Sequence, residues 1–398
     1  MDESPALYEK TTRGRFLLPA LAVARFAVSP PYIASGLLLV DIAATFGQPV
    51  GVMGQMGTTS SSLSMVAALI MAVLSIRFRH KSLLLTGLGF IVLSALGCYI
   101  APTFSTLIIV YSLVGIGNSI VSPMTMTLVG TYISREDRPR AVGWLIAGNS
   151  LSYLIGAPLI AILAGLGSWR TAFLLWVAPV ALLGIGSVMI SLPSENKGMR
   201  GASNVNYAAS FKAVLSNRSA IACLLGAALI MASYQAILVY SASFYRQQFL
   251  VSRSFASMLV IGGALFFTVG SIGCARLVKR YGRKPVIIIN GIIGGLLISS
   301  YTNIPNFWFS ISARFLGGLF IAFAFSALNS LTLEQVPEHR GTLMSISQAV
   351  TSIGSALGSF MGGMALLWYG YPLVGISLGA LAISSAVITY FLASDPHV

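Results

Sequence analysis

Long apolar stretches separated by short basic segments dominate this sequence of 398 residues and restrict it to one broad class of fold. Only 9% of the residues are charged and 56% are hydrophobic, which excludes an ordinary soluble domain. Because a helix of about 20 apolar residues crosses a bilayer, each stretch can form most or all of a transmembrane helix. We predict spans over residues 16–40, 50–76, 82–101, 104–132, 141–165, 171–192, 218–243, 254–278, 285–303, 306–333, 342–368 and 372–393.

The most informative segment, GCARLVKRYGRK at Gly273–Lys284, covers the end of the eighth stretch and the residues before the ninth. It holds five cations, namely Arg276, Lys279, Arg280, Arg283 and Lys284. Cations collect where helices leave the bilayer on the cytoplasmic side. Gly282 can adopt a positive φ, and Pro285 suits the first turn of the next helix. The segment therefore predicts a tight helix–turn–helix at the cytoplasmic face.

The same pattern occurs in weaker form 203 residues earlier, where Arg77–Ser82 aligns with Arg280–Pro285. Gly156 and Gly358 are separated by a similar 202 residues. A nearly constant offset indicates two copies of one unit, a common construction among secondary transporters. Six spans in each copy keep the copies parallel. We predict an all-α membrane protein with twelve transmembrane helices in two parallel six-helix repeats. Its domains are an N-terminal bundle over 1–192, a cytoplasmic linker over 193–217 and a C-terminal bundle over 218–398.

The distribution of basic residues predicts the orientation. The segments expected on the cytoplasmic side hold 19 of the 24 Lys and Arg residues, and the outer segments hold 3. We expect a multi-pass protein in the lipid bilayer of the cell membrane, with both termini cytoplasmic. The net charge of +14 does not indicate nucleic acid, because the cations lie in short clusters between apolar runs. We expect no cofactor and no metal, since the three cysteines lack the spacing of a metal site. We also expect a monomer.

In these features nearly the whole chain resembles the major facilitator superfamily, in its drug-efflux branch with twelve spans. Arg280, Gly282, Arg283 and Lys284 match the superfamily's loop motif G-x3-D-R/K-x-G-R/K-R/K, and Lys279 stands in the acidic place. In the first half, Arg77, His80 and Lys81 are similar to it, and Ile76 replaces the acid. In the fourth span, Tyr111 stands where the superfamily carries an arginine, and the second copy has Arg314.

The fifth span, Gly148-x7-Gly156-Ala157-Pro158, is similar to the superfamily's antiporter signature, and Gly354, Gly358 and Gly362 of the eleventh span resemble it without the proline. Small residues four apart let helices approach closely, and a proline bends a helix that has to rock. The resemblance implies a conformational gate that contains Arg77, Lys81, Arg280, Gly282, Arg283, Lys284, Gly156 and Pro158.

Several polar residues within the spans are candidates for substrate binding. They are Arg25, Tyr32, Asn118, Asn149, Tyr153, Tyr234, Gln235, Arg314 and Asn329. A charge at the centre of a span costs about 2.5–3.5 kcal/mol, so Arg25 has to face a wet cavity or a partner. It either attracts an anion or controls access, or it only bonds backbone carbonyls. For Arg314 the alternative is a structural bond to a neighbouring helix.

Proton coupling requires a titratable group that both sides can reach. The ten acids are mostly in loops and termini, and Asp41, at the outer end of the first span, is the best candidate for a coupling carboxylate. A solvated helix end is the alternative for Asp41.

The sequence therefore favours a secondary active transporter that moves a small organic molecule by alternating access, as an exporter coupled to protons or another ion. The alternative is an organic-anion carrier that uses Arg25 and Arg314, because no acid lies at the centre of a span. An enzyme is not expected, since no paired carboxylates or histidine cluster occur at membrane depth. ATP-driven transport is not expected either, because the sequence lacks the phosphate-binding motif G-x4-G-K-S/T.

Overall fold

The computed structural model describes residues 16–133, 137–192, 207–336, 338 and 340–395, and every regular element in these ranges is helical. The first half contains α3 (Leu17–Phe26), α4 (Pro30–Leu37), α5 (Leu39–Phe46), η1 (Val50–Met53), α6 (Gly54–Arg77), α7 (His80–Ile100), α8 (Phe104–Tyr132), α9 (Arg138–Gly165), α10 (Trp169–Ala172), η2 (Phe173–Val177) and α11 (Ala178–Ser191). After α12 (Tyr207–Ser216), the second half contains α13 (Arg218–Gln248), α14 (Arg253–Tyr281), α15 (Arg283–Tyr301), α16 (Phe307–Gln335), α17 (Arg340–Tyr369) and α18 (Tyr371–Leu392).

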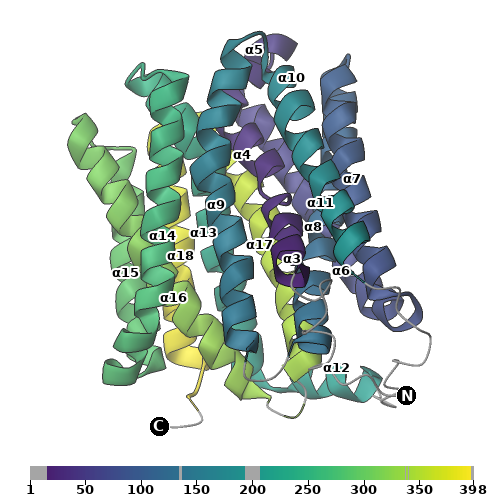
Figure 1. The fold of residues 1–398 in the computed structure, drawn as a ribbon. Coiled ribbons are helices and arrows are strands. Elements are labelled where there is room, and N and C mark those ends of the chain that lie inside the picture. The colour runs from purple at the N-terminus through teal and green to yellow at the C-terminus, as the bar shows by residue number, and fades with distance from the viewer. Residues whose placement is uncertain (1–15, 134–136, 193–206, 337, 339, 396–398) are drawn as a thin grey trace.

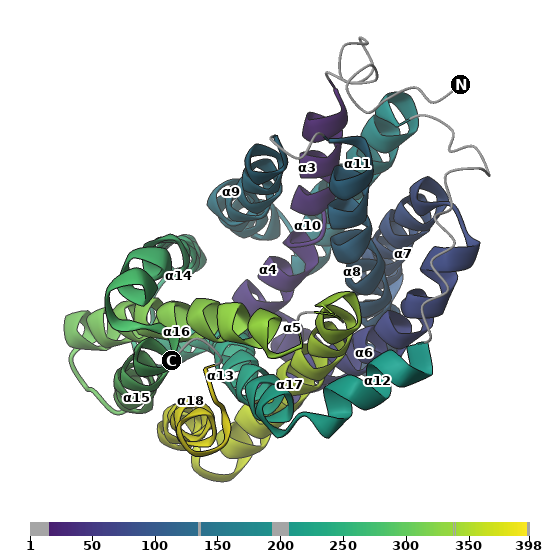
Figure 2. The ribbon, with the colours of Figure 1, turned by 90° about the horizontal axis from the view of Figure 1, so that it is seen from below.

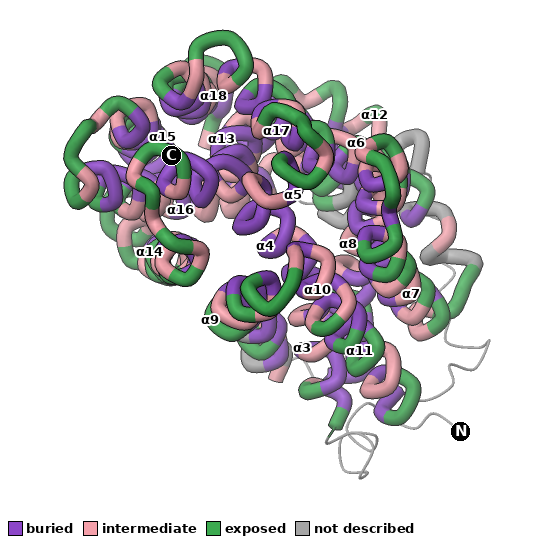
Figure 3. Tube along the Cα trace, turned by 90° about the horizontal axis from the view of Figure 1, so that it is seen from above, coloured by how far each residue is buried: buried purple, intermediate pink, exposed green. Residues whose placement is uncertain are grey.

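The long helices run side by side between two opposite faces of the molecule (Figure 1). We call these the α5 face, which carries α5 and α10, and the α12 face, which carries α12, the turn at Gly282 and the end of α18. In the described chain, eleven segments are long and apolar enough to cross a membrane, and α6 adds the twelfth helix of the bundle. Figure 3 shows buried residues between the helices and exposed residues around the outside. Ile190 and Ile272, for example, are 76% and 71% exposed, as expected for side chains in contact with lipid.

Each half repeats one packing pattern. The first helix of a half packs against its fifth and sixth, so that α3 contacts α9 and α11 as α13 contacts α17 and α18. The third helix packs against the fourth and sixth, so that α7 contacts α8 and α11 as α15 contacts α16 and α18. The shared pattern confirms the two predicted repeats, which form two groups of helices in Figure 2.

The two halves meet through equivalent helices. The second helix of each half packs against the fifth helix of the other, because α6 contacts α17 and α14 contacts α9. The first helices also meet, since α4 contacts α13. This arrangement leaves the space between α3–α4 and α13 as the place where both halves can contribute side chains to one site.

The first span is broken into three pieces, α3, α4 and α5. Pro30 and Pro31 occupy the first turn of α4, where no backbone N–H is needed for the helix. The same two prolines cannot continue the hydrogen bonding of α3, which ends at Phe26. Near the break, Arg25 contacts Ser122 of α8 and Ser29 contacts Asn149 of α9.

The segment predicted as a linker over 193–217 ends in a helix. Residues 193–206 lie outside the described residues, and α12 follows them. Phe211 and Val214 of α12 pack against an apolar cluster with Leu224, Leu343 and Ile346. The last part of the polar stretch is therefore docked against α13 and α17, because its apolar residues recur at helical spacing.

Glycines of α17 allow very close packing against α13. A Cβ added at Gly354 would lie 2.1 Å from the Ala228 carbonyl oxygen, and one at Gly358 would lie 1.9 Å from that of Ala232. No real Cβ fits at such distances without a shift of the backbone. The close approach expected from the small residues in the eleventh span is therefore present.

We predict that Gly358→Ala destabilises the protein, because its methyl group has to push α17 away from α13. Overpacking of this kind costs about 1–3 kcal/mol. Gly318→Ala in α16 is the matched control, since its Cβ would meet nothing within 4 Å and alanine favours a helix. Thermal unfolding in detergent should show a lower midpoint for Gly358→Ala only. Equal midpoints for the two variants would contradict the packing.

Candidate functional site

A cavity of 290 Å³ lies between the two halves, close to the lower limit for small-ligand pockets. Seven of the nine predicted substrate-binding residues line it, and Arg314 and Asn329 are not among its lining residues. The first half contributes Arg25, Val28, Ser29, Tyr32, Ser61, Ser64, Asn118, Asn149 and Tyr153. The second half contributes Met231, Tyr234, Gln235, Leu238, Phe325, Gln348, Thr351, Ser352 and Ser355.

Hydrogen bonds fix the polar side chains of the first half. The Arg25 guanidinium donates through Nη1 to the Ser122 hydroxyl, which in turn donates to Asn118 Oδ1 at 2.7 Å. The Ser29 hydroxyl donates to Asn149 Oδ1, also at 2.7 Å. These two networks join the broken first span to α8 and α9. Hydrogen bonds between the helices therefore hold this wall of the cavity together.

Arg25 is the only charged residue among the described residues that line the cavity. It is half-buried, and it uses one donor on Ser122 while its side chain faces the cavity. A guanidinium carries five donors in a fixed fork, so several remain for water or a bound molecule. The cavity therefore combines one positive charge with a surrounding of hydroxyl, phenol and amide groups.

The second half provides an aromatic side and a hydroxyl side. Tyr234 stacks on Phe267 of α14, with ring centroids 4.1 Å apart. On α17, Gln348, Thr351, Ser352 and Ser355 line the cavity. Sequence reasoning missed this α17 group, although its spacing of three and four residues is that of one helical face.

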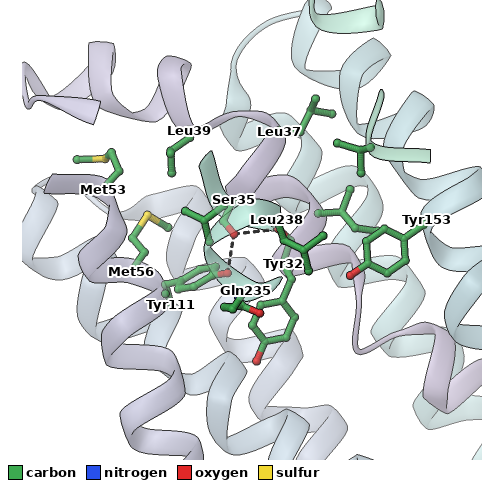
Figure 4. A pocket seen from close by; sticks show the side chains of 14 residues that line it. Tyr32, Ser35, Leu37, Leu39, Met53, Met56, Tyr111, Tyr153, Gln235 and Leu238 are labelled. Carbon is green, nitrogen blue, oxygen red and sulfur yellow. Dashed lines mark hydrogen bonds between the residues drawn. The ribbon is translucent and has the colours of Figure 1, made fainter. Parts of the chain in front are cut away.

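Toward the α5 face the space narrows to a constriction of only 20 Å³, little more than one water. Figure 4 shows its side chains, which include Tyr32, Tyr153 and Gln235 from the cavity together with Met53 and Met56 from the second span. A molecule that fits the cavity cannot pass this point.

Backbone contacts between the halves also hold them together on the α5 side of the cavity. A Cβ added at Gly36 would lie 2.6 Å from the Leu238 carbonyl oxygen. Gly51 and Gly363 are equally close, since a Cβ on Gly363 would lie 2.5 Å from the Gly51 carbonyl oxygen. Glycine is needed at these positions because two backbones meet there.

A cluster of three charges joins the halves at the α5 face, and we call it the clasp: Asp41, Arg246 and Arg253. Asp41 Oδ2 lies 2.5 Å from Arg246 Nη1, and Asp41 Oδ1 lies 2.6 Å from Arg253 Nη2. The side chains of Asp41 and Arg246 are only 14% and 12% exposed. Asp41 is therefore not a solvated helix end.

The two arginines of the clasp also bind helix ends of the first half. Arg246 donates to the Leu37 carbonyl at the end of α4, at 3.2 Å. Arg253 donates to the Ala164 carbonyl near the end of α9, also at 3.2 Å. Carbonyls at helix C-termini carry partial negative charge, so each cation has two partners across the boundary.

Comparison with known proteins gives the family. The model of the Major Facilitator Superfamily matches residues 21–249 and 223–398. The chain belongs to this superfamily. It is 24% identical over 378 residues to a "Probable sugar efflux transporter" of Pasteurella multocida, covering 92% of this chain and 89% of that one. It is 26% identical over 378 residues to the "Transcription regulatory protein OpdE" of Pseudomonas aeruginosa, covering 94% and 92%.

A solved structure supports the superfamily's fold. A bacterial homolog of the human lysosomal transporter Spinster, in an inward-facing and occupied conformation, matches with a TM-score of 0.76. It is 14% identical, and the match covers 96% of each chain. At this identity the likeness concerns the fold alone.

Tyr111 and Arg314 stand at the position where the superfamily carries an arginine in the fourth span, and in this chain each bonds a neighbouring helix of its own half. Tyr111 bonds the Ser35 hydroxyl at 2.7 Å. In the second half, Arg314 is buried and donates to the Ser241 hydroxyl of α13 and the Leu259 carbonyl of α14. Arg314 thus contacts neighbouring helices rather than the cavity. Asn329 is half-buried on α16.

The superfamily's loop motif also lies at the α12 face. Lys81 donates to the carbonyls of Met189 and Leu192 at the end of α11. Gly282 has a φ of 83°, which confirms the backbone conformation expected of the tight turn. Arg283 lies near Glu334 and Asp395, at 3.8 and 3.6 Å. These contacts join each loop to helices of its own half.

The remaining gate candidates are placed as follows. Arg280 lies over the Tyr281 ring, and Lys284 faces Tyr390. Gly156 is buried in α9, where a Cβ would lie 3.3 Å from Trp176 Nε1, and Pro158 lies inside the same helix. The side chain of Arg77 lies outside the described residues.

We predict that Arg246→Gln opens the α5 face. Loss of a partly buried ion pair costs about 2 kcal/mol, which corresponds to about a thirtyfold change in population. A cysteine at Met56, buried in the constriction, reports the change through its rate of labelling by a membrane-impermeant maleimide. Arg170→Gln is the control, since Arg170 is at the same face but donates to Ala101 within its own half. An unchanged labelling rate in Arg246→Gln would show that the clasp does not hold the face closed.

Proposed function

We propose that this protein is a secondary active transporter that exports a small polar organic molecule by alternating access, as a monomer in the cell membrane. The observation that carries the proposal is the cavity shared by both halves and closed toward the α5 face. In the proposed cycle the halves rock about this cavity. The clasp and the glycine contacts then separate, and the α12 face closes.

The α12 face is proposed to be cytoplasmic. The bases of the Gly273–Lys284 segment support this orientation, because cations accumulate on the cytoplasmic side of membrane proteins. The similar solved structure is in an inward-facing conformation and offers a precedent for a molecule closed on one face. An opening of the cavity toward the α12 face would then admit substrate from the cytoplasm, as an exporter requires.

We propose a hydroxylated substrate without positive charge. Hydroxyl and amide groups from Ser29, Asn118, Asn149 and Gln348 offer donors and acceptors around the cavity, and its described lining contains no acid. The Pasteurella relative is named a probable sugar efflux transporter, which points in the same direction. A substrate screen in proteoliposomes that compares sugars, polyols and carboxylates tests this assignment.

The second candidate function is organic-anion transport, favoured by Arg25 as the single cation of the cavity. Arg25→Gln distinguishes the two. Glutamine keeps an N–H donor, so a neutral substrate exchanges a hydrogen bond from a charged group for one from a neutral group. This loses about 1 kcal/mol, and its apparent affinity should fall by about tenfold or less. An anion loses a charge-assisted bond of up to about 3 kcal/mol, and its affinity should fall by about a hundredfold.

Uptake assays on reconstituted wild type, Arg25→Gln and the charge-matched control Arg170→Gln measure these affinities. Arg170 lies at the α5 face, away from the cavity, so its variant should behave as wild type. If Arg25→Gln left the affinity for every transported compound unchanged, the proposed binding cavity would be wrong.

We further propose Asp41 as the carboxylate that couples transport to protons. In the closed clasp its charge holds two arginines of the other half, and opening of the α5 face would expose it to the outer solution. A proton taken up there has to leave toward the α12 side as the clasp closes, because the carboxylate must be ionised to bind both arginines again, so each closure would carry one proton inward. The position of the carboxylate thus links its charge directly to the movement of the halves.

Asp41→Asn should abolish the acceleration of transport by an imposed pH gradient but retain exchange without a gradient. Arg246→Gln is the matched control, because it also breaks the clasp yet keeps the carboxylate, and it should still respond to the gradient. Substrate flux in proteoliposomes with and without the gradient gives both values. A normal gradient response in Asp41→Asn would exclude this residue as the coupling site.

A further inference from the structure

A second cavity, separate from the central one, lies at the α12 face between the start of α15 and the end of α18. Its volume is 570 Å³. Its lining includes Tyr281, Lys284 and Ile288 on one side and Tyr390 on the other. It lies wholly within the second half, so it has no part in the central transport site.

Arg283 and Lys284 line this cavity, and the Arg280 guanidinium lies 5.1 Å from the centre of the Tyr281 ring, which also lines it. Lys279 and Arg280 are exposed on the last turn of α14, and Lys284 lies in the first turn of α15. The Lys284 ammonium lies 5.8 Å from the centre of the Tyr390 ring, a contact that leaves its three N–H donors available. Arg283 faces the carboxylates of Glu334 and Asp395, the second of which also lines the cavity.

The walls of the cavity have the character of a membrane interface. Tyr281 and Tyr390 are each 55% exposed, and tyrosines concentrate at the level of lipid headgroups. Ile288 of α15 lines the cavity, and the next residue, Ile289, is 56% exposed. Basic side chains thus lie beside exposed tyrosine and isoleucine side chains.

We propose that this cavity binds an anionic phospholipid of the leaflet at the α12 face. The phosphate accepts hydrogen bonds from Lys284 and lies within the field of Lys279 and Arg280, as basic pockets at membrane surfaces do for acidic lipids. The acyl chains lie along Ile288 and Ile289. A soluble anion would match the cations but would leave this apolar wall without a partner. The lipid joins the turn at Gly282 to the end of α18.

Native mass spectrometry of the purified full chain tests the proposal, after incubation with equal amounts of phosphatidylglycerol and phosphatidylcholine. Wild type should retain phosphatidylglycerol preferentially. Lys284→Gln should reduce this retention about fivefold, as expected for one basic residue at an anionic surface. Arg79→Gln, which removes the same charge from the corresponding loop of the first half, should retain as much as wild type.

Millimolar inorganic phosphate, added as a separate arm, should leave the bound lipid in place. Size-exclusion elution and helicity confirm that both variants are folded. Equal retention of the two lipids by wild type, or equal losses in the two variants, would overturn the proposal. Displacement by phosphate would overturn it too, since the cavity would then be a phosphate site.

Discussion

Close backbone contact at glycine holds this molecule together, because helices surrounded by lipid gain little from burying apolar side chains against one another. Within the second half, Gly354 and Gly358 bring α17 against the carbonyls of α13. Between the halves, Gly51 and Gly363 achieve a similar approach. The same kind of contact thus serves two purposes. It is permanent within a half, and between the halves it is the contact that has to separate if the protein works by alternating access.

Polar side chains complement the glycines by joining helices at specific points. Tyr111 and Arg314 occupy equivalent positions in the two halves, and each bonds a serine of the first helix of its own half. The clasp differs, because Asp41 belongs to one half and its two arginines to the other. Removal of a tie within a half would weaken that bundle, whereas loss of the clasp would weaken only the contact between the halves.

The central cavity depends on both kinds of contact. The break of the first span at Pro30 and Pro31 places Arg25 and Ser29 beside different neighbours, and hydrogen bonds to Ser122 and Asn149 hold them there. The second half adds the hydroxyl group of residues on α17. A binding site made from two bodies can change its access without rebuilding either wall, and this favours transport over chemistry as the use of the cavity.

Much of this architecture followed from the sequence. The apolar lengths, the offset near 203 residues between Arg77 and Arg280, and the turn at Gly282 determined an all-α membrane fold in two repeats, because length, repetition and turn chemistry act locally along the chain. Polar residues within spans also marked most of the cavity lining, since such residues are costly in lipid. The tertiary structure alone decided that Asp41 binds Arg246 and Arg253, more than 200 residues away, and that Arg314 contacts neighbouring helices rather than the cavity. Partners of this kind depend on how the two halves meet, and no local pattern in either half records that contact.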